Sequence, residues 1–167
     1  MLDDDGPPAG WDVGERRMWE AYRNGEWCEG VPQVRGEAVR RLLLTAPPPR
    51  PGQLARLRLR GVRVLGELDL SETVVRGAVR LRRCRFDETP RLEGAQWEAL
   101  ELDECRLPGL RAHSARTARE FKVTRCTVDG TLDLRSLSVV THLSLAVTTV
   151  RPAPGAPDVT APSAAVA

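Results

Sequence analysis

The sequence predicts a mainly β protein: a right-handed quadrilateral β-helix over residues 54–150, preceded by an N-terminal helical cap. Three observations favour this fold. Pairs of apolar residues recur at a nearly constant step, charged residues avoid the paired positions, and similar residues recur one coil apart. A β-helix is a solenoid in which each coil buries its inner side chains against its neighbours, and about 4–5 coils fit this segment.

The first observation is a pair of apolar or small residues separated by one outward residue. Eighteen such pairs run from Leu57/Leu59 to Thr148/Val150, and every step between pairs is five or six residues. An amphipathic helix would space its apolar residues by three and four, and a hairpin meander would alternate over longer runs. The observed step instead indicates a short strand followed by a corner, with four faces in a coil of about 21 residues.

The charge and column patterns agree with this step. Residues 54–150 contain 17 basic and 13 acidic residues, all of them outside the paired positions. Positions one coil apart should stack inside the solenoid, so they should carry similar side chains. Four such columns are Leu59, Leu81, Leu102, Val123 and Leu145; Leu57, Val79, Leu100, Phe121 and Leu143; Phe86, Leu107, Val128 and Val150; and Cys84, Cys105 and Cys126.

The other segments surround this solenoid. We expect a disordered tail over residues 1–10, a two-helix N-terminal cap over 11–46, a proline-rich linker over 47–53 and a disordered tail over 151–167. The cap is placed to cover the N-terminal end of the coils, where backbone groups would otherwise lack partners. No comparable cap is expected after Val150.

The cap itself is predicted from helix signals. Asp12 and Glu15 form a capping box at the start of the first helix, and Gly25 provides its stop. A second helix is expected from about Val34 to Leu44, because its apolar residues share one face and the prolines that follow cannot continue it.

Composition bounds the location and the partners. The formal net charge is +2 at pH 7, which gives no strong attraction to nucleic acid or acidic membranes. Every basic residue except Lys122 is arginine, a bias typical of a GC-rich genome, so arginine content alone is not a binding signal. The first residues lack signal-peptide features, no apolar run approaches a membrane span, and four cysteines without an export signal favour reduced thiols. We therefore expect a cytoplasmic protein.

Several short stretches resemble known proteins. The stretches Leu68–Ser71, Cys105–Leu107 and Leu132–Leu134 resemble the repeat of the pentapeptide-repeat family. The stretches Gly61–Ser71, Cys84–Glu88 and Leu107–Leu110 resemble actinobacterial proteins that pair a helical N-terminus with such coils and are often labelled "membrane-associated oxidoreductase". The resemblance covers roughly residues 12–150 and implies the β-helix fold. Some relatives in the family bind DNA gyrase as acidic DNA mimics.

The cysteine column has two interpretations. The sulfurs of Cys84, Cys105 and Cys126 would lie about 5 Å apart, close enough to hold a soft metal or to pair as a disulfide. Inner positions of a coil also favour small apolar residues, and a free cysteine is one of these. We prefer the second interpretation and expect no metal, with these three residues as the alternative metal site.

An outward column of arginines is the candidate anion-binding site. Arg63, Arg85 and Arg106 are spaced to stack on the outside of successive coils. Like charges about 5 Å apart repel each other, so a bound anion would stabilise them. The alternative is neutralisation by nearby carboxylates such as Asp87 and Glu104.

The last coil is the candidate contact surface. The stretch 136–150 contains no charged residue, even at outward positions. We expect it to contact a protein, either a second copy or another chain, with Val140, His142, Ala146 and Val147 as interface candidates. The alternative is that the tail 151–167 folds back over this coil. His113 and His142 have no nucleophile or carboxylate at a telling spacing, and each is interpreted as a surface histidine.

These patterns favour a non-catalytic protein-interaction or scaffold module without catalytic residues or cofactors. A gyrase-directed DNA mimic needs an acidic face, whereas residues 54–150 carry 17 basic against 13 acidic residues, a net of +4. An enzyme matching the oxidoreductase label would need a cofactor loop or a redox pair, and the sequence has neither Gly-x-Gly-x-x-Gly nor Cys-x-x-Cys. Binding of an anionic polymer through the arginine column is a fourth hypothesis.

Overall fold

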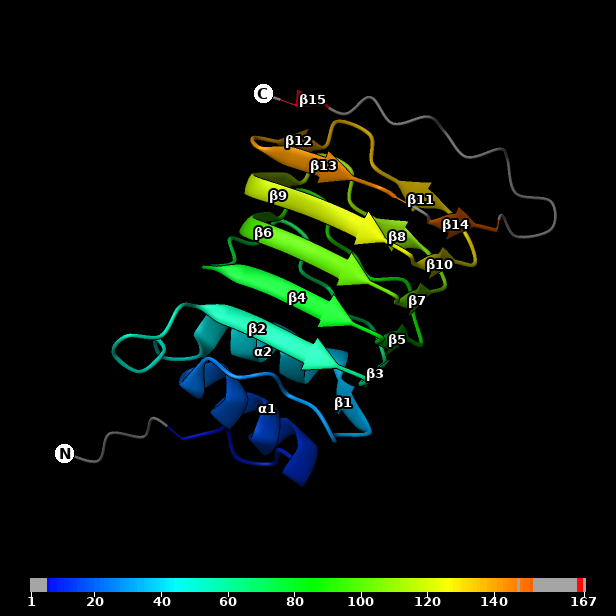
Figure 1. The fold of residues 1–167 in the computed structure, drawn as a ribbon. Coiled ribbons are helices and arrows are strands. Elements are labelled where there is room, and N and C mark those ends of the chain that lie inside the picture. Colours follow the sequence, from blue (N-terminus) through cyan, green and yellow to red (C-terminus); the bar gives the residue numbers. More distant parts are fainter. Residues whose placement is uncertain (1–5, 147, 152–164, 167) are drawn as a thin grey trace.

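The computed structural model describes residues 6–146, 148–151 and 165–166, and it is a mainly β solenoid of about four coils with two helices. Helix α1 (Val13–Asn24) and helix α2 (Gly36–Thr45) lie at the N-terminal end of the stack, below the first coil (Figure 1). Every strand pairing in the stack is parallel, as expected when successive coils run in the same direction. No helix in the described part of the chain is long and apolar enough to cross a bilayer.

Four faces make up each coil, as the sequence predicts. Face one carries β2 (Arg56–Arg60), β4 (Ala78–Arg82), the later part of β6 (Gln96–Asp103), the later part of β9 (Arg116–Thr124) and β13 (His142–Ser144). Face two carries β1 (Gln33–Arg35), β3 (Arg63–Leu65), β5 (Arg85–Phe86), β7 (Arg106–Leu107), β10 (Thr127–Val128) and β14 (Thr149–Val150).

The other two faces have fewer strand residues. Face three carries β8 (Leu110–Arg111) and β11 (Leu132–Asp133), extended by single bridges from Asp69 to Arg91 and from Arg91 to Arg111. Face four carries the first residues of β6 and β9, then β12 (Ser138–Val139) and β15 (Ala165–Val166).

The predicted columns are confirmed by the strand register. Leu57 pairs with Val79, Val79 with Leu100, Leu100 with Phe121, and Phe121 with Leu143. The inward positions are buried with five half-buried exceptions, Thr73, Leu143, Leu145, Thr148 and Val150. Because four of these five exceptions lie in the last coil, the core is complete through the middle of the stack and thins at its C-terminal end.

Where the spacing between inward pairs changes from five residues in one coil to six in the next, the strands form a β-bulge. Trp97 pairs with Thr117, but Ala99 pairs with Glu120, so β9 has one more residue than β6 between these pairs. The side chains of Trp97 and Thr117 are both buried on this face. The extra residue accommodates a six-residue step next to a five-residue step without breaking the stack.

The solenoid begins earlier than residue 54. Cys28 forms a bridge with Leu59, and β1 pairs with β3, so residues 28–35 make a half coil below the first complete one. Val34, which was expected in the second helix, is a strand residue instead, and α2 begins at Gly36. The expectation failed because Val34 shares the apolar stripe of the helix, and only its pairing with Val64 distinguishes strand from helix.

Two corners of each coil use the left-handed backbone conformation. At the corner between faces one and two the residues are Gly61, Arg83, Glu104 and Arg125, with φ between 52° and 66°. At the corner between faces three and four they are Glu72, Gly94, Ser114 and Ser136. Each non-glycine residue there has a conformational cost of order 1 kcal/mol. At five of the corners a backbone hydrogen bond to the next coil helps to offset this cost, with Glu72, Arg83, Glu104, Ser114 and Arg125 as the donors.

The first helix is anchored to the half coil by an ion pair between the buried Glu15 and the half-exposed Arg35. The capping box is confirmed: the Glu15 backbone N–H donates to Asp12 Oδ1 at 2.8 Å, and the Asp12 N–H donates to Glu15 Oε2 at 3.2 Å. The Arg35 guanidinium donates to both Glu15 oxygens, at 2.7 and 2.8 Å, although the Glu15 side chain is fully buried. These hydrogen bonds from Arg35 hold the pKa of Glu15 below its usual value.

Candidate functional site

The inward-facing side chains of the C-terminal coil are less buried than those of the coils below it. Leu143 and Leu145 are half-buried, whereas Leu100 and Leu102, at the same positions two coils earlier, are 3% and 2% exposed. In the described residues β13 pairs only with β9, and β14 pairs only with β10, so both strands leave one edge without a strand partner.

The predicted interface residues lie along one side of this coil. Val140 is 50% exposed, and His142 and Ala146 are exposed as well. They run from the end of face four along face one, since Val140 follows β12 and His142 opens β13. Val147 lies outside the described residues. The outward side of this coil is therefore uncharged and accessible over its described part.

The tail was expected to be disordered, and most of it lies outside the described residues. Arg151, Ala165 and Val166 are described, and the last two form β15, which pairs in parallel with Ser138 and Val139. The end of the chain thus returns to face four of the last coil and covers the edge of β12. The last coil was expected either to be a free contact surface or to be covered by the tail. The tail covers it on face four, where β15 pairs with β12, whereas β13 and β14 are not paired with β15.

The arginine column stacks as predicted. Arg63 pairs in register with Arg85, and Arg85 with Arg106. Arg63 Nε lies 2.7 Å from Asp87 Oδ1, and Arg106 Nε lies 2.9 Å from Asp129 Oδ2. Both outer arginines therefore have their own carboxylate, and within the described chain Arg85 alone of the three has no ion pair.

The cysteine column is also where the sequence places it. Cys84, Cys105 and Cys126 are free thiols, each 2% exposed. Each thiol donates a hydrogen bond to a carbonyl oxygen one coil below, at 3.3–3.5 Å, on Leu59, Leu81 and Leu102 respectively. This regular pattern satisfies the sulfurs without a metal.

The pKa shifts of the thiols differ along the column. Hydrogen bonding to the sulfurs of Cys126 and Cys84, together with burial, raises the pKa of Cys105 above its usual value, whereas the same hydrogen bonds lower the pKa of Cys84 and Cys126. Burial raises the pKa of Cys28 to about 11. Thiolate is the form that binds metal, so neutral pH leaves Cys105 and Cys28 protonated. In the described part of the chain no three His, Cys, Asp or Glu residues are arranged to hold a metal ion.

A charged network on face three is not apparent from the sequence. His113 Nδ1 lies 3.4 Å from Asp133 Oδ2, although the two residues are twenty apart in the chain. Next to them the side chain of Glu93 is only 6% exposed and lies between Arg111 Nε at 2.9 Å and Arg91 Nε at 3.4 Å. His113 therefore has a neighbouring carboxylate, which the sequence analysis did not predict. The separation of His113 and Asp133 by about one coil is the sequence signal that would have identified this pair.

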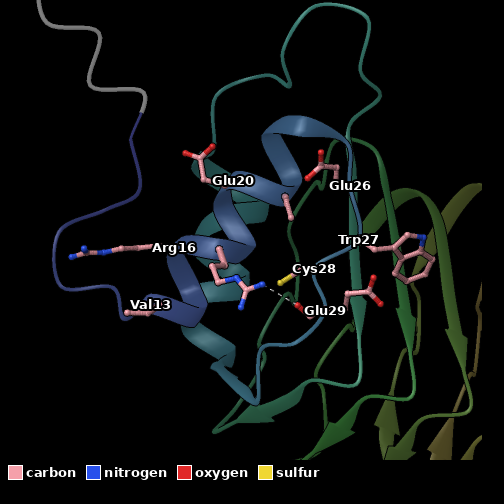
Figure 2. Close-up of a pocket in the computed structure, with 9 residues that line it drawn as sticks. Val13, Arg16, Glu20, Glu26, Trp27, Cys28 and Glu29 are labelled. Carbon is pink, nitrogen blue, oxygen red and sulfur yellow. Dashed lines mark hydrogen bonds between the residues drawn. The ribbon is translucent and has the colours of Figure 1, made fainter.

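A hollow beside α1 has a volume of about 470 Å³ and is lined by residues of α1 and of the segment 26–29. Figure 2 shows Trp27 on the side of the pocket that faces the strands, with Arg16 and Val13 on the opposite side of α1. The pocket carries both signs of charge, and its Cys28 thiol is buried, so no group in it is prepared for nucleophilic chemistry.

Comparison of the chain with protein-family models, with curated proteins and with solved structures found no match.

Proposed function

We propose that this chain is a non-catalytic interaction module that binds a protein partner through its last coil. The observation that carries the proposal is the contrast in burial along one column: Leu100 and Phe121 are buried, whereas Leu143, directly above Phe121, is half-buried. Covering Leu143 and its neighbours would remove apolar area from water at roughly 25 cal/mol per Å².

The backbone supports the same surface. Within the residues that the structure describes, the upper edges of β13 and β14 have no strand partner, so their N–H and C=O groups can accept an added strand. The outward side chains of β13 and β14 themselves are uncharged, so a partner would not have to desolvate a charged group on these strands, and the exposed Arg151 follows directly after β14. A rigid stack of coils presents this surface without the entropy loss that ordering a loop would cost.

A site-specific crosslink tests the proposal. A photo-crosslinking amino acid would replace Ala146, which is exposed in the last coil, or Ala118, an exposed alanine in the coil below, as the matched control. We expect a discrete crosslinked protein product from position 146 and none from position 118, in cells of the native host. The product should disappear when Val140→Glu and His142→Glu are added. Identical products from both positions, or none from either, would contradict the proposal.

A further inference from the structure

The outward side of the first two coils on face one is almost entirely arginine. Arg56, Arg58 and Arg60 alternate along β2, and Arg80 and Arg82 lie in register with Arg58 and Arg60 on β4. Alternate residues on a strand are about 6.6 Å apart and paired strands about 4.8 Å apart. Five guanidinium groups therefore share a surface about 13 Å long, which we call the arginine patch.

The charge of the arginine patch is only partly compensated. Arg60 lies 3.3 Å from a carboxylate oxygen of Glu29, and Arg80 lies 2.9 Å from one of Glu101. Arg82 lies 3.6 Å from Asp103, a carboxylate that Arg125 approaches more closely, at 2.7 Å.

Arg56 and Arg58 have no ion pair with any carboxylate in the described residues. Burial lowers the pKa of Arg58, and the neighbouring charges of Arg56 and Arg80 lower it further. Like charges held this close are stabilised by a bound anion. The arginine patch thus differs from the column of Arg63, Arg85 and Arg106, where both outer members are paired.

An aromatic ring borders the arginine patch. The Trp27 ring lies 4.6 Å from the guanidinium carbon of Arg60 and 6.0 Å from that of Arg58. Trp27 is half-exposed, whereas Trp11, Trp19 and Trp97 are all buried. Figure 2 shows its indole next to the strands rather than inside the cap. Arginines that track a backbone beside an aromatic ring are the combination that binds single-stranded nucleic acid without sequence preference.

We propose that the arginine patch, with Trp27, binds the phosphodiester backbone of single-stranded nucleic acid. Guanidinium groups form bidentate hydrogen bonds with phosphate oxygens, and the indole offers a face on which a base can stack. The low net charge of the whole chain does not oppose this site, because binding depends on the local charge that a backbone meets. The arginine patch lies on the first coils, so it is separate from the contact surface of the last coil.

The test measures binding of the full chain to labelled oligonucleotides by fluorescence anisotropy at several salt concentrations. The probes are single-stranded oligothymidine and oligoadenosine, with a DNA duplex, anionic vesicles and polyglutamate as competitors. The variant Arg56→Gln/Arg58→Gln is compared with Arg85→Gln/Arg116→Gln, which removes the same charge from faces two and four. Intrinsic fluorescence provides a second readout, because Trp27 is the one half-exposed tryptophan among the four.

We expect the patch variant to lose at least about ten-fold in affinity and the control less than about two-fold. The slope of log K against log salt should become less negative by about 1.4, since each lost phosphate contact on a single strand contributes about 0.7. Oligothymidine should quench Trp27 fluorescence. Urea unfolding checks that both variants fold, and Arg56→Gln alone provides a milder test.

Three results would overturn the proposal. One is absence of oligonucleotide binding to the wild-type chain at low salt. Another is an equal loss in the two double variants, which would indicate non-specific charge attraction. The third is stronger competition by duplex, vesicles or polyglutamate than by a single strand, which would assign the arginine patch to a different anion.

Discussion

A stack of coils has strand edges and an apolar core at each of its two ends. The two ends of this stack differ in how far these edges and the core are covered. At the N-terminal end the half coil of residues 28–35 is followed by α2, and the ion pair of Arg35 with the buried Glu15 holds α1 against β1. At the C-terminal end Leu143 and Leu145 stay half-buried, and β15 pairs with face four only. An exposed strand edge above an apolar core is a template for pairing with another chain unless a cap covers it.

The electrostatics of the two ends also differ. The first coils carry the arginines of the arginine patch on face one, and several of them pair with acids of the adjacent coils. The last coil has no charged side chain at all. Under the two proposals above, the N-terminal end binds an anionic ligand and the C-terminal end binds an apolar protein surface.

The largest expected effect tests the anchored end. Glu15→Ala should lower the free energy of unfolding by about 3 kcal/mol, because it removes half of the capping box and the charge-assisted hydrogen bonds that Arg35 donates to the Glu15 carboxylate. Urea unfolding measures this change. The control is Glu20→Ala on the same helix, whose exposed pair with Arg50 at 3.4 Å should contribute no more than about 0.5 kcal/mol. A similar loss in both variants would refute the anchoring role.

A second pair of variants compares the core of the two regions directly. Leu100 and Leu143 occupy the same column, but only Leu100 is buried. Leu100→Ala should cost about 3 kcal/mol, whereas Leu143→Ala should cost about 1 kcal/mol, because less area returns to water and no closed cavity forms. Denaturant unfolding of the two variants measures both values. If Leu143→Ala proved as costly as Leu100→Ala, the last coil would already be covered.

The ion pair of the anchored end should also be visible as a pH dependence. Because the folded pKa of Glu15 lies below its unfolded value near 4.5, its contribution is fully present above that pH. It should be lost as the pH falls through the folded pKa. The difference in stability between the wild type and Glu15→Gln should thus be constant from neutral pH to about pH 5 and shrink below about 4.5. A difference independent of pH down to 3 would argue against an ionised Glu15.

The smallest expected effect concerns local opening. Amides of β13 should exchange with solvent at least about ten-fold faster than amides of β4, because β4 is paired on both sides and β13 on one. Hydrogen exchange followed by mass spectrometry or NMR measures the rates. Addition of a bound partner should slow the exchange of β13 and leave β4 unchanged.

Much of the fold was predictable because the coil step is a local property of the chain. The inward pairs identify each face, and the columns that end at Leu143 and Val150 follow from counting. The Asp12–Glu15 box and the Gly25 stop were predictable for the same reason, since their partners are three residues apart or in the same turn. The start of α2 was not, because strand and helix bury the same Val34.

The candidate sites were predictable only as positions. The sequence places Arg63, Arg85 and Arg106 in one column, but it does not say that Asp87 and Asp129 reach across to the outer two. The arginine patch was not predictable, because Arg56 and Arg58 are two of many arginines in the sequence. That they form no ion pair in the described residues depends on how neighbouring coils align.

The sequence by itself determined which side chains face inward, where the corners fall, and that the last coil is uncharged, because these depend on spacing along the chain. Only the tertiary structure decided that Cys28 and Val34 begin the solenoid, that Glu15 reaches Arg35, and that Ala165 and Val166 return to β12. The physical reason is the same in each case. These contacts join segments whose separation follows no repeat, so their free energy exists only once the coils are stacked.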